Sequence, residues 1–137
     1  MNLAFFDTNI LLYGEDASAP DKQKLASALF ADHLRRSTAV LSVQVLQEFF
    51  NGATRKLMLD AEFAHKRVET FSLTNIVRIE AKDVIAAIEL HRLRQISFWD
   101  ALIVHAARIS GATVLYSEDL QHKSVLGGVR IVNPFIT

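Results

Sequence analysis

The chain opens with MNLAFFDTN (residues 1–9), an apolar run that ends abruptly at an acidic residue, Asp7. Residues 3–6 are all apolar and of strand length, which is typical of a strand buried on both faces of a parallel sheet. Asp7 then lies at the carboxyl end of that strand. Ligands and catalytic groups collect at this edge of open α/β sheets, because strand-leaving loops and helix amino ends converge there. The opening stretch therefore predicts an α/β fold with an acid at its functional edge.

Strands and helices alternate along the rest of the chain. Short apolar runs bounded by turn residues predict further strands at residues 38–41, 75–79, 113–116 and 129–132. Helical spacing of apolar residues and capping residues predict a helical turn at residues 9–13 and helices at residues 21–36, 42–56, 60–71, 81–95 and 98–110. This alternation favours a mostly parallel sheet covered by helices on both faces. With no internal repeat or linker, we expect one continuous domain over residues 1–137.

Composition limits the class of protein. The 137 residues are 50% hydrophobic, enough for one domain with a sizeable core. Lys and Arg number 15, as do Asp and Glu, so the formal charge is zero and demands neither nucleic acid nor membrane. Cysteine is absent, which excludes disulfides and thiol chemistry and favours a reducing compartment. With no signal peptide pattern and no run of about 18 apolar residues, we expect a soluble cytoplasmic protein.

Three further acids are predicted at the same sheet edge as Asp7. Asp100 lies in the first turn of the helix over residues 98–110, and a crossover helix begins at the carboxyl edge of the strands. Asp119 follows the strand over residues 113–116. Glu48 lies nearly two turns into its helix, roughly 9 Å from the start by helical rise. The sequence thus allows four carboxylates from distant segments to meet.

Each acid also has a purely structural interpretation. Asp7 can form an Asx-turn after the strand. Asp100 forms the S-x-x-D pattern of a capping box with Ser97, a role that also suits the helix dipole. Glu48 alone reads as a solvated helix acid, and Asp119 as part of a capped loop. Only the joint placement favours a functional site.

Electrostatics gives that joint placement a meaning. Clustered carboxylates cannot all stay ionised unless some take up protons or cations neutralise them. An all-oxygen site selects Mg²⁺ or Mn²⁺ over zinc or copper. One or two such ions activate water and stabilise the leaving oxygen in phosphodiester cleavage. The pattern therefore indicates metal-assisted hydrolysis.

The remaining charge agrees with a phosphate-containing substrate. Without the four acids, 15 basic residues stand against 11 acidic ones. Basic pairs at residues 35–36, 55–56 and 66–67 are candidates to hold a phosphate backbone along the rim, although such pairs are often only solvated helix faces.

Four blocks carry a family resemblance: FFDTNILLY, SVQVLQEFF, ISFWDALIVHAA and GATVLYSEDL. In order and spacing they resemble the PIN-domain ribonucleases, most closely the VapC-type toxins of toxin–antitoxin pairs, and the closing VRIVNPF is similar as well. The resemblance covers essentially the whole chain. It implies a three-layer α/β/α sandwich, Mg²⁺- or Mn²⁺-dependent endoribonuclease activity on RNA, and a small antitoxin partner. It also implies a homodimer or a toxin–antitoxin hetero-oligomer.

The resemblance also assigns roles by position. Asp7, Glu48, Asp100 and Asp119 match the four metal-binding, catalytic acids, of which the first and third are the firmest ligands. Supporting positions in the family match Thr8, Asn9 and Ser117. Glu118 is an extra acid beside Asp119, and the family spacing favours Asp119 as the one that faces the ion.

Other residues are expected to be structural. The histidines show no chelating spacing. Trp99 at a helix start is expected to pack rather than to serve as a base-stacking platform. The helix over residues 81–95 is expected to bury its apolar side chains Val84, Ile85, Ile88 and Leu93. Core positions are also expected at Phe49, Phe50, Leu57, Met58 and Phe63, and any of residues 57–63 left exposed would be a candidate groove for an antitoxin helix.

Two rival functions stay open at this point. A haloacid-dehalogenase-like phosphohydrolase also begins with an acid after the first strand, but it needs a second acid two residues later, where this chain has Asn9. A catalytically decayed partner-binding module is the second rival, and the presence of all four acids argues against it.

Overall fold

The computed structural model describes residues 2–136, and its central element is a six-stranded sheet of order β3-β2-β1-β4-β6-β5. The strands are β1 (Ala4–Phe6), β2 (Ala39–Ser42), β3 (Asn75–Val77), β4 (Val114–Tyr116), β5 (Val125–Leu126) and β6 (Val129–Val132). The helices are α1 (Thr8–Tyr13), α2 (Pro20–Arg35), α3 (Val43–Arg55), α4 (Ala61–Phe71), α5 (Ala81–Arg94) and α6 (Phe98–Ser110). Every pairing is parallel except that of β5 with β6. The predicted α/β class and mostly parallel sheet are confirmed.

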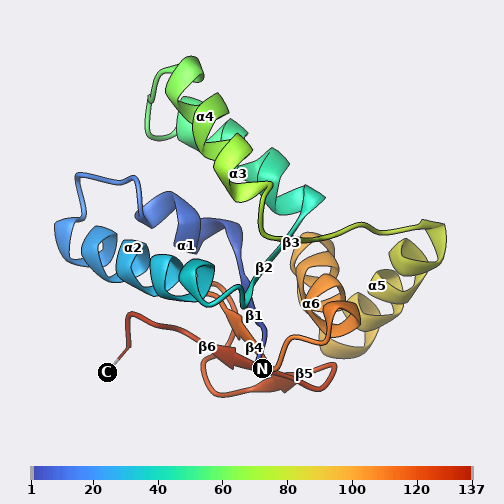
Figure 1. The fold of residues 1–137 in the computed structure, drawn as a ribbon. Coiled ribbons are helices and arrows are strands. Elements are labelled where there is room, and N and C mark those ends of the chain that lie inside the picture. Colours follow the sequence, from blue (N-terminus) through green and yellow to red (C-terminus); the bar gives the residue numbers. More distant parts are fainter. Residues whose placement is uncertain (1, 137) are drawn as a thin grey trace.

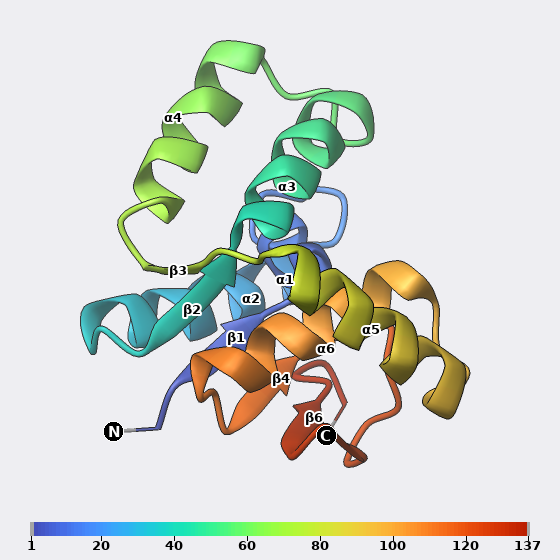
Figure 2. The ribbon, with the colours of Figure 1, turned by 90° about the vertical axis from the view of Figure 1, so that its right-hand side faces the viewer.

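Helices cover both faces of this sheet. One side carries α1 and α2, and the other carries α5 and α6, as two views at right angles show (Figures 1 and 2). The remaining helices, α3 and α4, pack against each other and extend beyond the sheet (Figure 1, green). The arrangement is the expected three-layer α/β/α sandwich with a helical pair added at one end.

The register brings the ends of β1 and β4 together. Phe6 is the partner of Tyr116, so the next residues, Asp7 and Ser117, emerge side by side at the carboxyl edge. The Asp7 amide continues the ladder by donating to the Tyr116 carbonyl at 2.9 Å. On the other flank β2 ends at Ser42, whose hydroxyl caps α3 by accepting from the Val45 amide. Strand ends and helix starts therefore share one edge, as the sequence predicts.

The antiparallel β5–β6 hairpin is the element that the sequence analysis misses. Its two strands are joined by Gly127 and Gly128, which both have positive φ, 57° and 81°. Two-residue hairpin turns of this kind favour glycine because L side chains are strained there. The Gly-Gly pair before an apolar run was the available signal, but β5 has only two residues.

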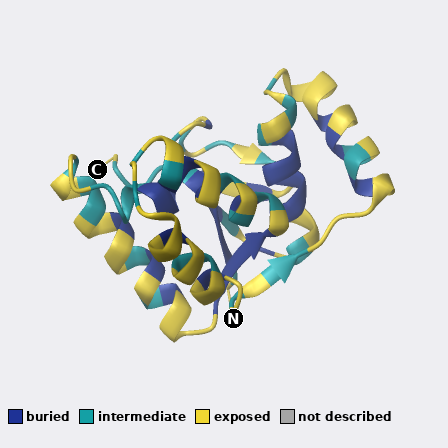
Figure 3. Cartoon of the chain, turned by 90° about the horizontal axis from the view of Figure 1, so that it is seen from above, coloured by how far each residue is buried: buried dark blue, intermediate teal, exposed yellow. Residues whose placement is uncertain are grey.

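The core is built from the strands and the helix faces that cover them (Figure 3, dark blue). At the junction of α2, α3 and α4 with β1, four phenylalanines meet edge to face. Phe30 packs against Phe6 and Phe71 with ring centroids 5.1 and 5.3 Å apart, and Phe49 packs on Phe71 at 4.8 Å. Such edge-to-face pairs stabilise beyond area burial, by about 0.5–1.5 kcal/mol each.

Several core predictions are wrong. Phe49 is buried as expected and Leu57 is partly buried, but Phe50, Met58 and Phe63 are exposed, Met58 at 79%. Phe50 lies on α3, Phe63 lies on α4 and Met58 lies in the loop between these helices, which extend beyond the sheet. The segment over residues 57–63 accordingly keeps exposed apolar side chains, as the antitoxin-groove hypothesis requires.

The predicted buried face of α5 is also wrong. Ile85, Ile88 and Leu93 are exposed, whereas Asp83, Ala87 and Leu90 are buried. Asp83 turns inward because its carboxylate accepts a hydrogen bond from buried His105 of α6, and that contact fixes the helix face. A smaller difference concerns α2, which begins at Pro20 with Ala19 as N-cap rather than at a cap by Asp21. None of the helices described in residues 2–136 is long and apolar enough to cross a membrane.

Candidate metal centre

Asp7 is the most deeply buried acid of the site, with 4% of the residue exposed. It caps α1, and its Oδ1 accepts from the Thr8 amide at 2.8 Å. Its Oδ2 accepts from the Ser117 hydroxyl at 2.9 Å. Burial raises the pKa of Asp7 from 3.8 to about 7, with additional repulsion from Asp119 and Asp100, even though both hydrogen bonds oppose the rise. Asp7 therefore carries an uncompensated cost of ionisation.

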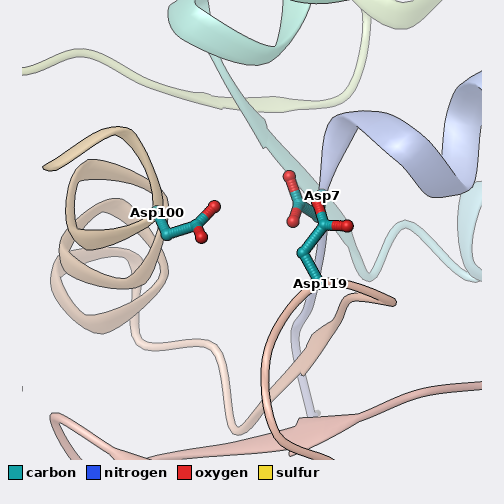
Figure 4. Close-up of side chains that lie close together, drawn as sticks. All are labelled: Asp7, Asp100 and Asp119. Atoms are coloured by element: carbon teal, nitrogen blue, oxygen red, sulfur yellow. The ribbon is translucent and has the colours of Figure 1, made fainter. Parts of the chain in front are cut away.

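Asp100 reaches the site from the first turn of α6. Ser97 caps this helix by accepting from the Asp100 amide at 3.0 Å, so half of the predicted capping box forms. The Asp100 carboxylate points toward the other two aspartates (Figure 4). Partial burial raises the pKa of Asp100, and the charges of Asp119 and Glu48 raise it further. The backbone of Asp100 thus takes part in the helix cap, while its side chain belongs to the acid cluster.

Asp119 enters from the loop that follows β4. Its Oδ2 accepts from Asn9 Nδ2 at 2.7 Å, and its amide donates to Ser117 Oγ at 3.2 Å. Ser117 is fully buried and contacts both Asp7 and Asp119, so one hydroxyl ties the two acids together. The predicted supporting positions, Asn9 and Ser117, each hold an acid of the cluster.

The three aspartates converge although they are far apart in the sequence. One oxygen from each of Asp7, Asp100 and Asp119 lies within 4.8 Å of the other two, and the close-up shows the three carboxylates facing one another (Figure 4). Burial, together with the charges of the neighbouring acids, raises the pKa of both Asp7 and Asp100. Three carboxylate donors without histidine or cysteine suit a hard divalent cation such as Mg²⁺ or Mn²⁺.

Glu48 lines the same hollow but lies outside this group of three. Its Oε1 accepts from the Thr8 hydroxyl at 2.6 Å, and its Oε2 accepts from Gln44 Nε2 at 3.1 Å. Thr8 thereby connects Glu48 to Asp7, since its own amide binds the Asp7 carboxylate. The structure brings the four predicted acids to one hollow, with three in mutual reach and Glu48 on the wall.

Glu118 faces away from the acids. Its carboxylate accepts from the Tyr13 hydroxyl at 3.0 Å and pairs with Lys22. Lys22 in turn lies over the rings of Tyr13 and Phe135. Glu118 therefore anchors the loop that carries Asp119, and the spacing argument that chose Asp119 as the inward acid agrees with the geometry.

The acids line a hollow of about 260 Å³ together with other side chains. Trp99 is one of them. It packs against the ring of Phe98 as predicted, but 61% of the residue is exposed. Lys56 is another, and of the described residues that line the hollow it is the only basic one. The signal for Trp99 was its position beside Asp100, whereas Lys56 belongs to the basic pair over residues 55–56 that the sequence analysis proposed for the rim.

The other predicted basic pairs are engaged elsewhere. Arg35 and Arg36 both bind Asp32 at 2.6 Å. Lys66 lies 3.6 Å from Glu62, and Arg67 lies 3.1 Å from Glu15. Of the three pairs, only the one over residues 55–56 reaches the hollow.

Comparison with known proteins adds independent information. The family model described as the PIN domain matches residues 4–126. Similar solved structures include VapC20 of Mycobacterium tuberculosis, described as a Sarcin-Ricin loop cleaving toxin, with TM-score 0.65, 23% identity, and coverage of 85% of this chain and 89% of that one. Another is the DNA-bound VapBC of Salmonella typhimurium, with TM-score 0.67, 22% identity, and coverage of 96% and 97%.

A third similar structure is FitAcB of Neisseria gonorrhoeae, with TM-score 0.64, 14% identity, and coverage of 97% of this chain and 99% of that one. At these identities the likeness shows a shared fold. No curated protein matches the chain significantly.

Proposed function

This chain belongs to the PIN domain family, and we propose that it is a divalent-metal-dependent endoribonuclease that acts as the toxin of a toxin–antitoxin pair. The observation that carries the proposal is the meeting of Asp7, Asp100 and Asp119, within 4.8 Å of one another, at the carboxyl edge of the sheet. The family match and the similarity to VapC20, a Sarcin-Ricin loop cleaving toxin, support the choice of reaction.

Asp7, Asp100 and Asp119 would hold the ion, either Mg²⁺ or Mn²⁺. The fit rests on two features of the described residues. The donors are all carboxylate oxygens, which these cations prefer. The pKa of Asp7 is raised to about 7 by burial and by its acidic neighbours, as expected for a site whose acids lack a compensating charge. A bound divalent cation supplies Lewis-acid activation of water and charge stabilisation at the cleaved phosphodiester.

The chain's own residues would keep the acids ready for that ion. Ser117 and the Thr8 amide hold the two oxygens of Asp7, and Asn9 holds Asp119. Such supporting hydrogen bonds fix ligand orientation and typically matter 10- to 100-fold. Glu48, kept on the wall by Thr8 and Gln44, would act as the fourth acid and accept a proton from water during cleavage.

Partners follow from the same proposal. The substrate would be RNA. A small antitoxin would hold the toxin inactive, in line with the similarity of this chain to VapBC and FitAcB. The functional unit would be a homodimer or a toxin–antitoxin hetero-oligomer, with residues 1–137 forming a single nuclease domain. Exposed apolar side chains at Met58 and Phe63 remain a candidate surface for an antitoxin helix.

The first experiment measures RNA cleavage and metal binding by the protein freed of partner. We expect cleavage with Mg²⁺ or Mn²⁺ and none in excess EDTA. Calorimetric titration with Mn²⁺ gives a second readout, and Asp100→Asn should lose both binding and cleavage while staying folded. Asp60→Asn is the matched control, because this exposed acid makes no side-chain capping bond and lies away from the hollow.

Undiminished cleavage in EDTA would falsify the metal mechanism. Release of phosphate from small monoesters, without RNA cleavage, would favour the phosphohydrolase instead. Binding of an antitoxin with no cleavage under any metal would indicate the decayed partner-binding module. A separate test of the toxin role is co-expression with a short adjoining reading frame, which should suppress growth inhibition by this chain.

A further inference from the structure

Trp99 is an exposed aromatic side chain at the mouth of the acid hollow. It lines the same hollow as Asp7, Asp100 and Asp119, and 61% of the residue is exposed. Large aromatic side chains are usually buried in the core or used at an interface. Other large aromatic side chains of this molecule, Phe5, Phe6 and Phe49, are fully buried, so the exposure of Trp99 is not general to its aromatic residues.

The backbone and ring of Trp99 are held in place from two sides. Its carbonyl accepts from Gln44 Nε2 of α3 at 3.3 Å, and the same amide group donates to Glu48. Its ring packs edge-on against Phe98, with centroids 5.2 Å apart and an interplanar angle of 66°. An edge contact restrains an aromatic ring and leaves a face available to a further flat group. The indole is thus a restrained surface next to the acids.

Lys56 supplies a positive charge in the same hollow. It lies at the end of α3, is exposed, and lines both this hollow and an adjoining one of about 310 Å³. The two hollows also share Asn9 and Leu12. No carboxylate is recorded within ion-pair distance of Lys56 in residues 2–136, unlike Lys22 and Lys66. An ammonium group in this position suits a phosphate, which it binds as a point charge.

We propose that Trp99 is a stacking platform for an unpaired RNA base beside the cleaved phosphodiester, and that Lys56 binds a neighbouring phosphate of the same strand. This inference rests on the proposed ribonuclease function and assigns two residues that would hold an unpaired stretch of the RNA. A nucleotide joins a flat base to a phosphate through one sugar, which matches an indole next in sequence to Asp100. In a duplex both faces of each base are covered by stacking, so an RNA helix would offer Trp99 nothing to bind.

The binding test uses Trp99 as its own reporter, since the chain contains a single tryptophan. A short single-stranded RNA is added to the wild-type protein with Ca²⁺ in place of Mg²⁺, and a gel confirms that the RNA stays intact. We expect saturable quenching of tryptophan fluorescence by this oligonucleotide. A duplex of the same sequence and an abasic strand of equal length should both quench at least tenfold less at equal concentration.

The kinetic test compares Trp99→Ala with Trp99→Phe on single-stranded RNA. Loss of one stacked base is expected to lower kcat/KM by roughly 5- to 150-fold, mainly through KM, and phenylalanine should restore most of it. Phe50→Ala is the matched control, because Phe50 is also an exposed aromatic but does not line the hollow. If Trp99 had only a structural role, Trp99→Ala would lower the melting temperature, and the loss of kcat/KM would be the same for intact and abasic RNA.

The Lys56 part of the inference is tested through salt. Lys56→Ala should weaken RNA binding for all sequences and reduce the slope of log K against log salt by about 0.7 to 1. Lys24→Ala, an exposed lysine on α2, should leave the slope unchanged. An unchanged slope in Lys56→Ala would remove the phosphate contact from the proposal.

The outcomes separate this inference from the function beneath it. If the wild-type protein cleaves RNA and Trp99→Ala cleaves it equally well, stacking is overturned and the nuclease stands. The same holds if Trp99→Ala fails only to bind antitoxin or to self-associate, since the indole then contacts protein. If the wild-type protein cleaves no RNA and its fluorescence does not respond, both are overturned.

Discussion

At the carboxyl edge of the sheet, Asp7 faces two other acids, whereas between α5 and α6 another buried aspartate, Asp83, faces a histidine. The His105 ring bonds Asp83 at 2.9 Å through Nε2 and Arg108 at 2.6 Å through Nδ1. Because the arginine can only donate, the His105 Nδ1 accepts and Nε2 carries the proton donated to Asp83. The pKa of Asp83 is lowered by the Glu80 amide and by His105, whereas that of Asp7 is raised by burial.

The difference teaches how to tell a structural polar cluster from a functional one. Asp83 and His105 each have complementary hydrogen-bond partners, and their contact joins α5 to α6. Around Asp7 the hydrogen bonds orient the acids but do not neutralise them. Acidic residues with a raised pKa of this kind are common at functional sites. The acid cluster therefore costs stability until a cation arrives, and the network around Asp83 contributes stability without one.

The largest expected effect comes from Asp7→Asn. Cleavage should fall about 10³-fold, because losing a ligand removes several kcal/mol of charge stabilisation and each 1.4 kcal/mol is tenfold in rate. The metal-free variant should nevertheless be more stable than the wild type at pH 8, by about 1–3 kcal/mol.

The sign of that stability change follows from the raised pKa of Asp7, about 7 in the folded state against 3.8 as the model value. The folded wild type keeps its proton between these values, so its stability falls as pH rises from about 4 to 7. Urea unfolding in EDTA at pH 5 and pH 8 measures it. The advantage of the variant should be small at pH 5, and an equal advantage at both pH values would contradict the assignment.

The second prediction concerns a variant that disrupts the cluster of Asp83, His105 and Arg108. His105→Leu should lower the free energy of unfolding by about 1–3 kcal/mol, because Asp83 and Arg108 lose their buried partner. RNA cleavage per folded molecule should stay unchanged. Urea unfolding and an activity assay on the folded fraction measure both, with exposed His65→Leu as the control. Loss of cleavage without loss of stability would contradict the purely structural role of the Asp83–His105 cluster.

The third prediction concerns pH and the metal. An ion must displace the proton that Asp7 holds below about pH 7, so Mn²⁺ affinity should rise about tenfold per pH unit toward that value and level off above it. From pH 5.5 to 7 the expected gain is roughly 15-fold, because Asp7 is only half ionised at pH 7. Calorimetric titrations across this range measure it. A constant affinity would mean that Asp7 is ionised without the metal.

The smallest expected effect comes from Thr8→Val, which removes the hydroxyl that holds Glu48 and keeps the shape of the side chain. Cleavage should fall about tenfold, at the low end for a residue that orients a site acid. Metal affinity should change much less, since Glu48 lies outside the group of three. Parallel measurement of kcat/KM and Mn²⁺ affinity checks this, and an equal loss in both would place Glu48 among the ligands.

Much of the site could be predicted because it depends on where strands end. Apolar runs that stop at Asp7 and shortly before Asp119 place both acids at the carboxyl edge in any parallel sheet. Asp100 follows from the position of a helix start. The hairpin of β5 was missed because two residues give no periodicity. The buried face of α5 was predicted wrongly because the prediction followed the apolar residues alone. Asp83 lies on the buried face because it contacts His105, 22 residues away.

By itself the sequence determined the α/β class, the edge where the acids gather, and the family, since these depend on local pattern and on motif order. Only the tertiary structure decided that three acids lie within 4.8 Å of one another while Glu48 lies outside this group. It also decided that Glu118 pairs with Lys22 and that Trp99 is exposed. Those outcomes depend on contacts between segments far apart in the chain. No local preference of a carboxylate or an indole says which distant side chain it will meet.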